Sequence, residues 1–167
     1  TYRDIANVQP FANTLINMQL TGAQLKAVLE EQWQRDAYNA LPTRPFLRLG
    51  VSEGFTYTYT QATVTETQLD NPATADNEAG RQYQAPQGTI TGMWLNGQPI
   101  DPAASYSVTV NSFLSTGGDN FRALAGGAGK RDTGKIDLTA MVDYMAEFAA
   151  DEPLPVDYAQ HAVEVAF

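Results

Sequence analysis

The strongest constraint on the fold is a run of strict alternation in the first half of the chain. Phe55, Tyr57 and Tyr59 alternate with three threonines over residues 55–60. Aromatic and β-branched residues with a period of two predict a β-strand that packs one face on a core. The fold must therefore contain a sheet, and the rest of the sequence has to supply its other strands.

Further strands are predicted on both sides of this run. Alternation of apolar residues predicts strands at 14–20, 89–95, 106–110 and 162–167. Asn96-Gly97 is typical of a type I′ hairpin turn, because both residues tolerate positive φ. The strands are therefore distributed along the whole chain.

Two amphipathic helices are predicted between these strands. Thr21 and Gln24 have the spacing of a capping box, at the start of a helix expected to run to about Asn39. Asp137 is expected to be the N-cap of the second helix. Helices and strands are interleaved without a regular βαβ repeat, so we predict an α+β fold. A single domain over residues 1–167, with helices packed on a mixed β-sheet, accounts for the pattern.

The segment from Glu66 to Gly88 departs from this pattern. Its apolar content is little more than Leu69, Tyr83 and some alanines. A segment with so little to bury is expected at the surface. We therefore predict that residues 66–88 form an exposed surface insertion, mobile or irregular.

The composition excludes several classes of function. The chain has no cysteine and one histidine, His161, so thiol nucleophiles and metal sites built from cysteines or several imidazoles are excluded. His161 lies far from any Gly-x-Ser-x-Gly motif, and we assign no catalytic residue and no metal ligand to this chain. Ten basic residues against 19 acidic ones disfavour binding of a nucleic-acid polymer. No apolar run approaches the ~20 residues of a membrane span.

Two glycine-rich segments are candidates for ligand binding. Residues 126–130 superficially resemble a phosphate-binding loop, but Arg131 stands where such a loop needs Ser or Thr, which favours a flexible surface loop. The segment from Asn111 to Asp119 joins a strand to a short helix through Gly117-Gly118, a position where α/β proteins commonly bind ligands. A tight turn with Asp119 as a helix cap explains the same residues.

Two phenylalanines stand at the ends of predicted elements. Phe11 precedes the first strand, and Phe113 follows the strand at 106–110. Beside turn residues, an aromatic side chain can be presented to a ligand. Burial of both rings in the core is the alternative.

The motifs at these two places form a specific combination. Pro-Phe-x-Asn lies within residues 2–13, and Leu-Thr-Gly follows at 20–22. Asn-x-Phe-x-x-x-Gly-Gly-Asp lies at 111–119, after Asn-Gly-Gln-Pro at 96–99. This order resembles the C-terminal, substrate-binding domain of the 5′-nucleotidase family, which includes UDP-sugar hydrolases and cyclic-nucleotide phosphodiesterases. The resemblance covers nearly the whole chain outside 66–88.

The resemblance implies a nucleoside site. Phe11 and Phe113 match two aromatics that sandwich the base, and stacking on an aromatic contributes ~1–3 kcal/mol for any base. Asn13 matches a side chain that hydrogen-bonds the base, and Asp119 matches a carboxylate that accepts ribose hydroxyls, which is a strong charge-assisted bond. The predicted substrate-binding residues are Phe11, Asn13, Phe113, Gly117, Gly118 and Asp119.

Two positions depart from the family pattern. Ala12 stands where the family often has glycine, and a requirement for positive φ there implies a shifted backbone at Asn13. Asn120 replaces a common glycine after Asp119. Asparagine tolerates the left-handed region, so this second change is mild.

The resemblance also implies what lies outside the chain. In this family an N-terminal metallophosphoesterase domain, which this chain does not contain, holds two divalent metal ions and hydrolyses nucleoside 5′-phosphates. This chain is then expected to bind the nucleotide or nucleoside, to contact that domain in cis, to need no cofactor of its own and to be inactive alone. The alternatives are the same domain in a 2′,3′-cyclic-nucleotide phosphodiesterase or a UDP-sugar hydrolase, or a non-catalytic cell-surface binding module.

The family resemblance also carries an expectation about location. Family members of this kind imply an exported protein, periplasmic or associated with the cell wall. Three lysines against seven arginines favour a GC-rich bacterial genome, which agrees with a secreted bacterial protein.

Overall fold

Helices are interleaved with the strands along the chain, and the strands form two separate sheets. The structure is a computed structural model that describes residues 1–149 and 152–166. In chain order the elements are α1 (Tyr2–Val8), β1 (Thr14–Thr21), α2 (Gly22–Glu30), β2 (Phe55–Thr67), β3 (Gln82–Leu95), β4 (Gln98–Pro99), β5 (Ser105–Asn111), α3 (Ser112–Ser115), the 3₁₀ turn η1 (Gly118–Asn120), α4 (Arg122–Ala125), β6 (Ala128–Ile136), α5 (Asp137–Phe148) and β7 (Ala162–Glu164).

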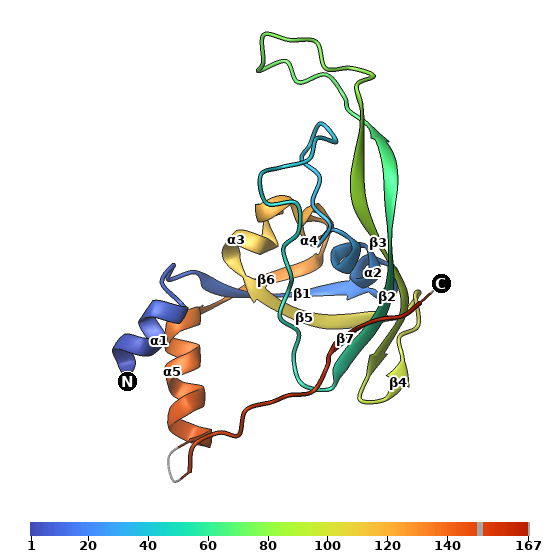
Figure 1. The fold of residues 1–167 in the computed structure, drawn as a ribbon. Coiled ribbons are helices and arrows are strands. Elements are labelled where there is room, and N and C mark those ends of the chain that lie inside the picture. Colours follow the sequence, from blue (N-terminus) through green and yellow to red (C-terminus); the bar gives the residue numbers. More distant parts are fainter. Residues whose placement is uncertain (150–151, 167) are drawn as a thin grey trace.

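The two sheets differ in their pairing. One has the order β5-β1-β6 and is antiparallel throughout. The other has the order β4-β3-β2-β7, in which β7 runs parallel to β2, so this sheet is mixed (Figure 1). The predicted α+β class of a single domain is confirmed, with the strands divided between two sheets.

The core consists of two hydrophobic clusters that share α2. The first cluster lies against the β1 sheet and contains Ile16, Met18, Leu20, Val28, Phe121 and Leu124. The second lies against the β2–β3 sheet and contains Leu29, Trp33, Tyr57, Tyr59 and Ile90. Val28 and Leu29 are neighbours in α2, so this helix packs on both clusters. Each cluster buries the apolar face that its sheet could not leave in water.

The start of α2 agrees with the sequence prediction. The hydroxyl oxygen of Thr21 accepts a hydrogen bond from the backbone N of Gln24 (3.2 Å). The Gln24 side chain in turn accepts one from the backbone N of Thr21 (2.8 Å). This is the predicted capping box, and it satisfies two helix N–H groups that would otherwise lack partners.

The end of α2 differs from the prediction. The helix ends at Glu30 rather than near residue 39. The residues that follow pair with the connector between α2 and β2 instead. The backbone N of Gln34 donates to the carbonyl of Pro45 (2.9 Å), and that of Leu47 donates to the carbonyl of Gln32 (2.9 Å). These long-range bonds replace the helical ones.

The structure corrects the bounds of the segment expected to be irregular. β2 and β3 pair residue by residue from Tyr59 and Ile90 as far as Thr67 and Gln82, beyond one register shift at Thr58–Tyr59, so residues 66–67 and 82–88 belong to strands. Ala85 is buried, with 1% of its surface exposed. The loop proper runs from 68 to 81, at the tip of a hairpin that projects from the rest of the domain (Figure 1). Residues 66–88 contain few apolar side chains because the two strands of this hairpin have little core to pack against.

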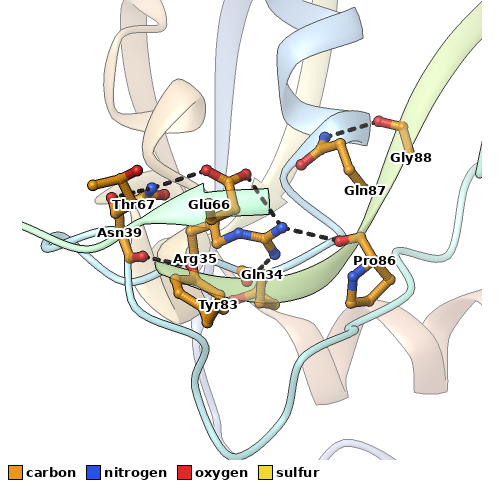
Figure 2. A network of polar contacts seen from close by, with 9 residues as sticks. All are labelled: Gln34, Arg35, Asn39, Glu66, Thr67, Tyr83, Pro86, Gln87 and Gly88. Carbon is orange, nitrogen blue, oxygen red and sulfur yellow. Dashed lines mark hydrogen bonds and ion pairs between the residues drawn. The ribbon is translucent and has the colours of Figure 1, made fainter. Parts of the chain in front are cut away.

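A polar network braces this hairpin where it leaves the core. Arg35 is buried and donates to the carboxylate of Glu66 (3.4 Å) and to the carbonyl of Pro86 (3.0 Å), one contact on each strand (Figure 2). Asn39 donates from its amide to the other oxygen of Glu66 (3.0 Å). The hydroxyl of Tyr83 donates to the carbonyl of Asn39. The turn at 35–39 therefore clamps both strands.

Three other elements differ from the sequence predictions. Residues 128–130, expected in a flexible loop, begin β6, which pairs with β1. Asp137 is the first residue of α5, and the N-cap is Ile136. β7 ends at Glu164, and Phe167 lies outside the described residues. Within the described part of the chain, no helix is both long enough and apolar enough to cross a bilayer.

Candidate functional site

Phe113 lies in α3, the short helix that follows β5. The side-chain oxygen of Asn111 accepts a hydrogen bond from the backbone N of Leu114 (2.8 Å), so Asn111 caps the short helix. The cap directs the chain out of the sheet. Phe113 is 49% exposed and belongs to neither core cluster.

The two glycines of the following turn are needed for its geometry. Gly117 has φ 93°, which side-chain-bearing residues rarely adopt. A Cβ atom on Gly118 would lie 2.6 Å from the ring of Phe113. The turn therefore packs directly against one side of the exposed phenylalanine, as a larger residue would not allow.

Asp119 occupies an unusual backbone conformation in this turn. Its φ is 50° and that of Asn120 is 61°, so two consecutive residues are left-handed. Asp119 is not the cap of the next helix, because α4 begins at Arg122 after Phe121. Its carboxylate is partly exposed and lies 3.5 Å from the guanidinium of Arg44. The carboxylate is thus available at the surface next to one cation.

Phe11 stands on the loop between α1 and β1. It is 79% exposed, so the alternative of a core position does not hold for this residue either. Ala12 has φ 53°. The backbone thus takes the left-handed conformation although the residue is alanine and not glycine. This conformation costs an alanine free energy, so Ala12 is locally strained.

Asn13 connects this loop to α3. The hydroxyl of Ser112 donates to the side-chain oxygen of Asn13 (3.3 Å). The backbone N of Asp137 donates to the carbonyl of Asn13 (2.9 Å). Because Ser112 directly precedes Phe113, the structure brings the Phe11 loop and the start of α3 together. The roles of these residues in binding stay predictions.

Two residues to which the sequence analysis gave no role in the site support the turn through hydrogen bonds. The side-chain oxygen of Gln34 accepts a hydrogen bond from the amide of Asn120 (2.9 Å). The ammonium of Lys130 donates to the carbonyls of Ser115 (2.6 Å) and Ala125 (2.8 Å). Gln34 is 86 residues from Asn120 and carries no local motif. Lys130 belongs to the glycine-rich segment 126–130, but its contacts with Ser115 and Ala125 are identified by the tertiary structure alone.

Glu31 contributes a third support. Both of its carboxylate oxygens accept from the backbone N of Ala123 (3.0 and 3.1 Å), in the first turn of α4. Burial raises the pKa of the Glu31 carboxyl, and the hydrogen bond from Ala123 opposes this rise. A carboxylate at this end of a helix ties α4 to the end of α2.

Two cavities lie near this group of residues. One of about 520 Å³ is lined mainly by apolar residues such as Leu29, Phe55 and Val108. The other, of about 230 Å³, is polar and is lined by residues that include Glu31 and Arg122. None of the six predicted residues lines either cavity. The candidate site therefore lies at the surface, on the α1–β1 loop, α3 and the turn η1.

The chemistry that these residues offer is binding. Exposed aromatic rings can stack, and the Asp119 carboxylate can accept hydrogen bonds. Within residues 1–149 and 152–166, no three His, Cys, Asp or Glu side chains are grouped so that they could hold a metal ion. The described residues therefore do not fit a dinuclear metal centre.

Comparison with known proteins places the chain in a family. Residues 1–126 match the family described as 5′-nucleotidase, C-terminal domain. A 5′-nucleotidase-related protein of Glossina morsitans morsitans is 30% identical over 91% of the chain and 24% of its own length. A 5′-nucleotidase of Vibrio vulnificus is 27% identical over 87% of the chain and 20% of its own length. The chain thus spans about a quarter or less of the length of these relatives.

A solved structure agrees with this match. The crystal structure of a 5′-nucleotidase precursor from Thermus thermophilus superposes with a TM-score of 0.65 at 25% identity. The superposition covers 99% of this chain and 28% of that one. The matched segment of 126 residues includes both phenylalanines, the two glycines and the left-handed turn. The chain therefore belongs to the 5′-nucleotidase C-terminal domain family.

Proposed function

We propose that this chain is the nucleoside-recognition domain of a two-domain, metal-dependent enzyme that hydrolyses nucleoside 5′-phosphates. The observation that carries the proposal is the exposure of Phe11, on the α1–β1 loop, and of Phe113, in α3, two segments that the Asn13–Ser112 hydrogen bond joins. Large aromatic side chains are usually buried, and two of them exposed in one region suit a flat apolar ligand. A nucleobase is such a ligand.

In this proposal the base stacks between the rings of Phe11 and Phe113. Stacking requires only a π-face, so it provides affinity without selecting one base. The contact between Gly118 and the Phe113 ring supports the proposal, because it limits the positions available to that ring. Asn13 contributes a hydrogen bond to the base edge in addition to its bond from Ser112.

Asp119 recognises the sugar in this proposal. A carboxylate has two acceptor oxygens, and the two adjacent hydroxyls of ribose are two donors. Such charge-assisted hydrogen bonds are roughly twice as strong as neutral ones. The partial exposure of Asp119 at the surface of the turn supports access for the ligand.

Catalysis is assigned to a different domain. Because the described residues do not fit a dinuclear centre, the proposal places two divalent metal ions in an N-terminal metallophosphoesterase domain that acts in cis. The chain by itself is expected to show no phosphatase activity on AMP with added Mn²⁺, Zn²⁺ or Ca²⁺. Export to the periplasm or cell wall of a bacterium is part of the same proposal, and rests on the family.

Titration of the 167-residue chain with adenosine, followed by NMR chemical shifts or calorimetry, tests the proposal. Phe113→Ala should weaken adenosine binding by about ten- to hundred-fold, because it removes one stacking face. Phe148→Ala is the matched control, since Phe148 is also exposed but stands at the far end of α5. No binding of adenosine, or equal loss in the two variants, would contradict a nucleoside site at Phe113.

A further inference from the structure

The turn that carries Asp119 has a conformation that the local sequence does not favour. Asp119 and Asn120 both have positive φ, and neither is glycine. Aspartate and asparagine tolerate this region better than other residues, but it still carries a cost. Such a conformation persists only where the surrounding structure holds it in place. The turn therefore requires support from outside itself.

Gln34 provides this support from a buried position. It is 1% exposed, and its side-chain oxygen accepts the hydrogen bond from the amide of Asn120 (2.9 Å). The amide nitrogen of Gln34 donates to the carbonyl of Glu31 (2.7 Å), which orients the oxygen toward Asn120. The Gln34 side chain thus has both of its polar groups satisfied and a defined direction.

The backbone of Gln34 is held as firmly as its side chain. Its N–H donates to the carbonyl of Pro45 (2.9 Å). Its carbonyl accepts from the guanidinium of Arg35 (2.9 Å), a bond that Figure 2 shows. The carbonyl of Arg35 accepts in turn from the guanidinium of Arg122 (2.9 Å). Residues 34–35 therefore hold the turn on both sides of Phe121, at Asn120 and at Arg122.

We propose that Gln34 is a positioning residue for ribose recognition, which holds Asn120 in the left-handed conformation and so directs the carboxylate of Asp119 toward the ribose hydroxyls. This inference rests on the proposed function. Gln34 does not touch the ligand. It acts through the Asn120 side chain, and it therefore affects the contact to the sugar while the stacking of the base on Phe113 continues.

The quantity that tests this role is the preference of the chain for adenosine over 2′,3′-dideoxyadenosine, which lacks both hydroxyls. We expect the unmodified chain to prefer adenosine by about tenfold. This factor corresponds to the charge-assisted hydrogen bond to Asp119 that the dideoxynucleoside cannot make. Gln34→Met retains size and removes the amide, and should reduce this preference to less than about threefold. Affinity for the dideoxynucleoside should change by less than about twofold in the same variant.

Gln32→Met is the matched control. Gln32 is fully buried and two residues away, and it bonds to Tyr57 and to the backbone of Leu49 instead of the turn. Both variants should lose stability, since each removes a buried amide from its partners. Only Gln34→Met should change the preference for adenosine. Equal changes in both variants would mean that Gln34 is merely structural and would overturn the inference.

A double-mutant cycle examines the route through Asn120. Asn120→Gly keeps positive φ accessible and removes the amide that Gln34 binds. In that background Gln34→Met should change the preference by less than about twofold, because the contact is already lost. A full effect of Gln34→Met without the Asn120 amide would overturn the inference.

The outcomes for the two proposals are distinguishable. An unmodified chain that prefers adenosine, with the preference unchanged in Gln34→Met, overturns the role of Gln34 alone. If the unmodified chain binds adenosine and the dideoxynucleoside equally, Asp119 makes no contact with the sugar. The proposed ribose recognition by Asp119 and the proposed role of Gln34 then both fail. Where Gln34→Met does not fold, Asn120→Ala provides the test, because it removes the same amide without giving the backbone the freedom of glycine, and it should reduce the preference to less than about threefold.

Discussion

The ammonium of Lys130 lies 2.6 Å from the carbonyl oxygen of Ser115, the last residue of α3. The same ammonium lies 2.8 Å from the carbonyl of Ala125, the last residue of α4. One cation on β6 thus binds the C-terminal ends of the two short helices that flank the Asp119 turn. Helix C-termini carry partial negative charge and unpaired carbonyls, so a lysine there is favourable.

Replacing this lysine should loosen the turn. Lys130→Met keeps the length of the side chain and removes the ammonium, and we expect the free energy of unfolding to fall by about 1 kcal/mol. Adenosine affinity should fall too, because α3 carries Phe113. Lys135→Met is the control, since Lys135 pairs with Asp143 at the surface and does not contact α3 or α4 within the described residues. Urea unfolding measures the first effect, and an equal change in both variants would contradict the specific role of Lys130.

Ala12→Gly should stabilise the domain. Ala12 has φ 53°, and glycine adopts this region without strain. The strain energy relieved at this position exceeds the entropic cost of ordering a glycine on folding. We therefore expect the free energy of unfolding to rise by about 0.5–1 kcal/mol. Ala125→Gly, in α4, should lose stability in the same urea titration. A loss at Ala12 as well would mean that its conformation carries no strain.

The stability of the C-terminal tail should depend on pH through one pair of residues. Nε2 of His161 lies 2.9 Å from the carboxylate of Asp157, and Nδ1 lies 3.0 Å from the carbonyl of Phe55 in β2. Both partners are acceptors, so the imidazolium form satisfies both nitrogens. The hydrogen bond with Asp157 raises the pKa of His161 above 6.5, with a further contribution from Phe55. The hydrogen bond from His161 lowers the pKa of Asp157 below 3.8.

The sign of the effect follows from these directions. The contribution of His161 is complete below pH 6.5 and is lost as the pH rises through its raised pKa. The contribution of Asp157 is present above pH 3.8 and is lost as the pH falls through its lowered pKa. Asp157→Asn should therefore lower the Tm at about pH 5.5 and have little effect at about pH 8.5. A difference in Tm between the unmodified chain and Asp157→Asn that is the same at both pH values, or larger at about pH 8.5, would contradict the prediction.

The hairpin should tolerate a short deletion and not a long one. The backbone N of Gln68 donates to the carbonyl of Arg81 (2.9 Å), so the ends of the loop are already paired. Replacing residues 69–80 with Asn-Gly, which suits a two-residue hairpin turn, should change the Tm by less than about 3 °C. Removing 66–88 should destabilise severely, because it deletes the buried Ala85 and the carboxylate that pairs with Arg35. Cooperative unfolding with an unchanged Tm in the longer deletion would contradict this account.

Much of the fold could be predicted where local pattern and tertiary packing agree. The strict alternation at 55–60 became the buried part of β2, and the Thr21 capping box begins α2. β6 was missed because all nine of its residues are exposed, so it has no alternation to recognise. α2 was predicted too long because its extension pairs with residues 45–47 of the connector, a partner that periodicity does not reveal.

The candidate site shows the same division. Phe11, Phe113 and the Gly-Gly-Asp turn could be named from their motifs, because each motif is contiguous in the sequence. Gln34 and Lys130 act on that turn from 86 residues before Asn120 and 15 residues after Ser115. Gln34 stands in no motif, and the glycine-rich segment that contains Lys130 does not indicate a contact with Ser115. Contacts between residues distant in the sequence could therefore not be predicted, and only the structure identifies them.

The sharing of α2 between the two core clusters has a consequence for local opening. Val28 packs on the cluster of the β1 sheet, and Leu29 packs on the cluster of the β2–β3 sheet. Detaching either sheet exposes one face of the helix, so neither sheet can open while the other and α2 remain intact. The amide hydrogens of α2 should consequently exchange with solvent only on global unfolding, and α2 is the element through which the two sheets melt as one unit.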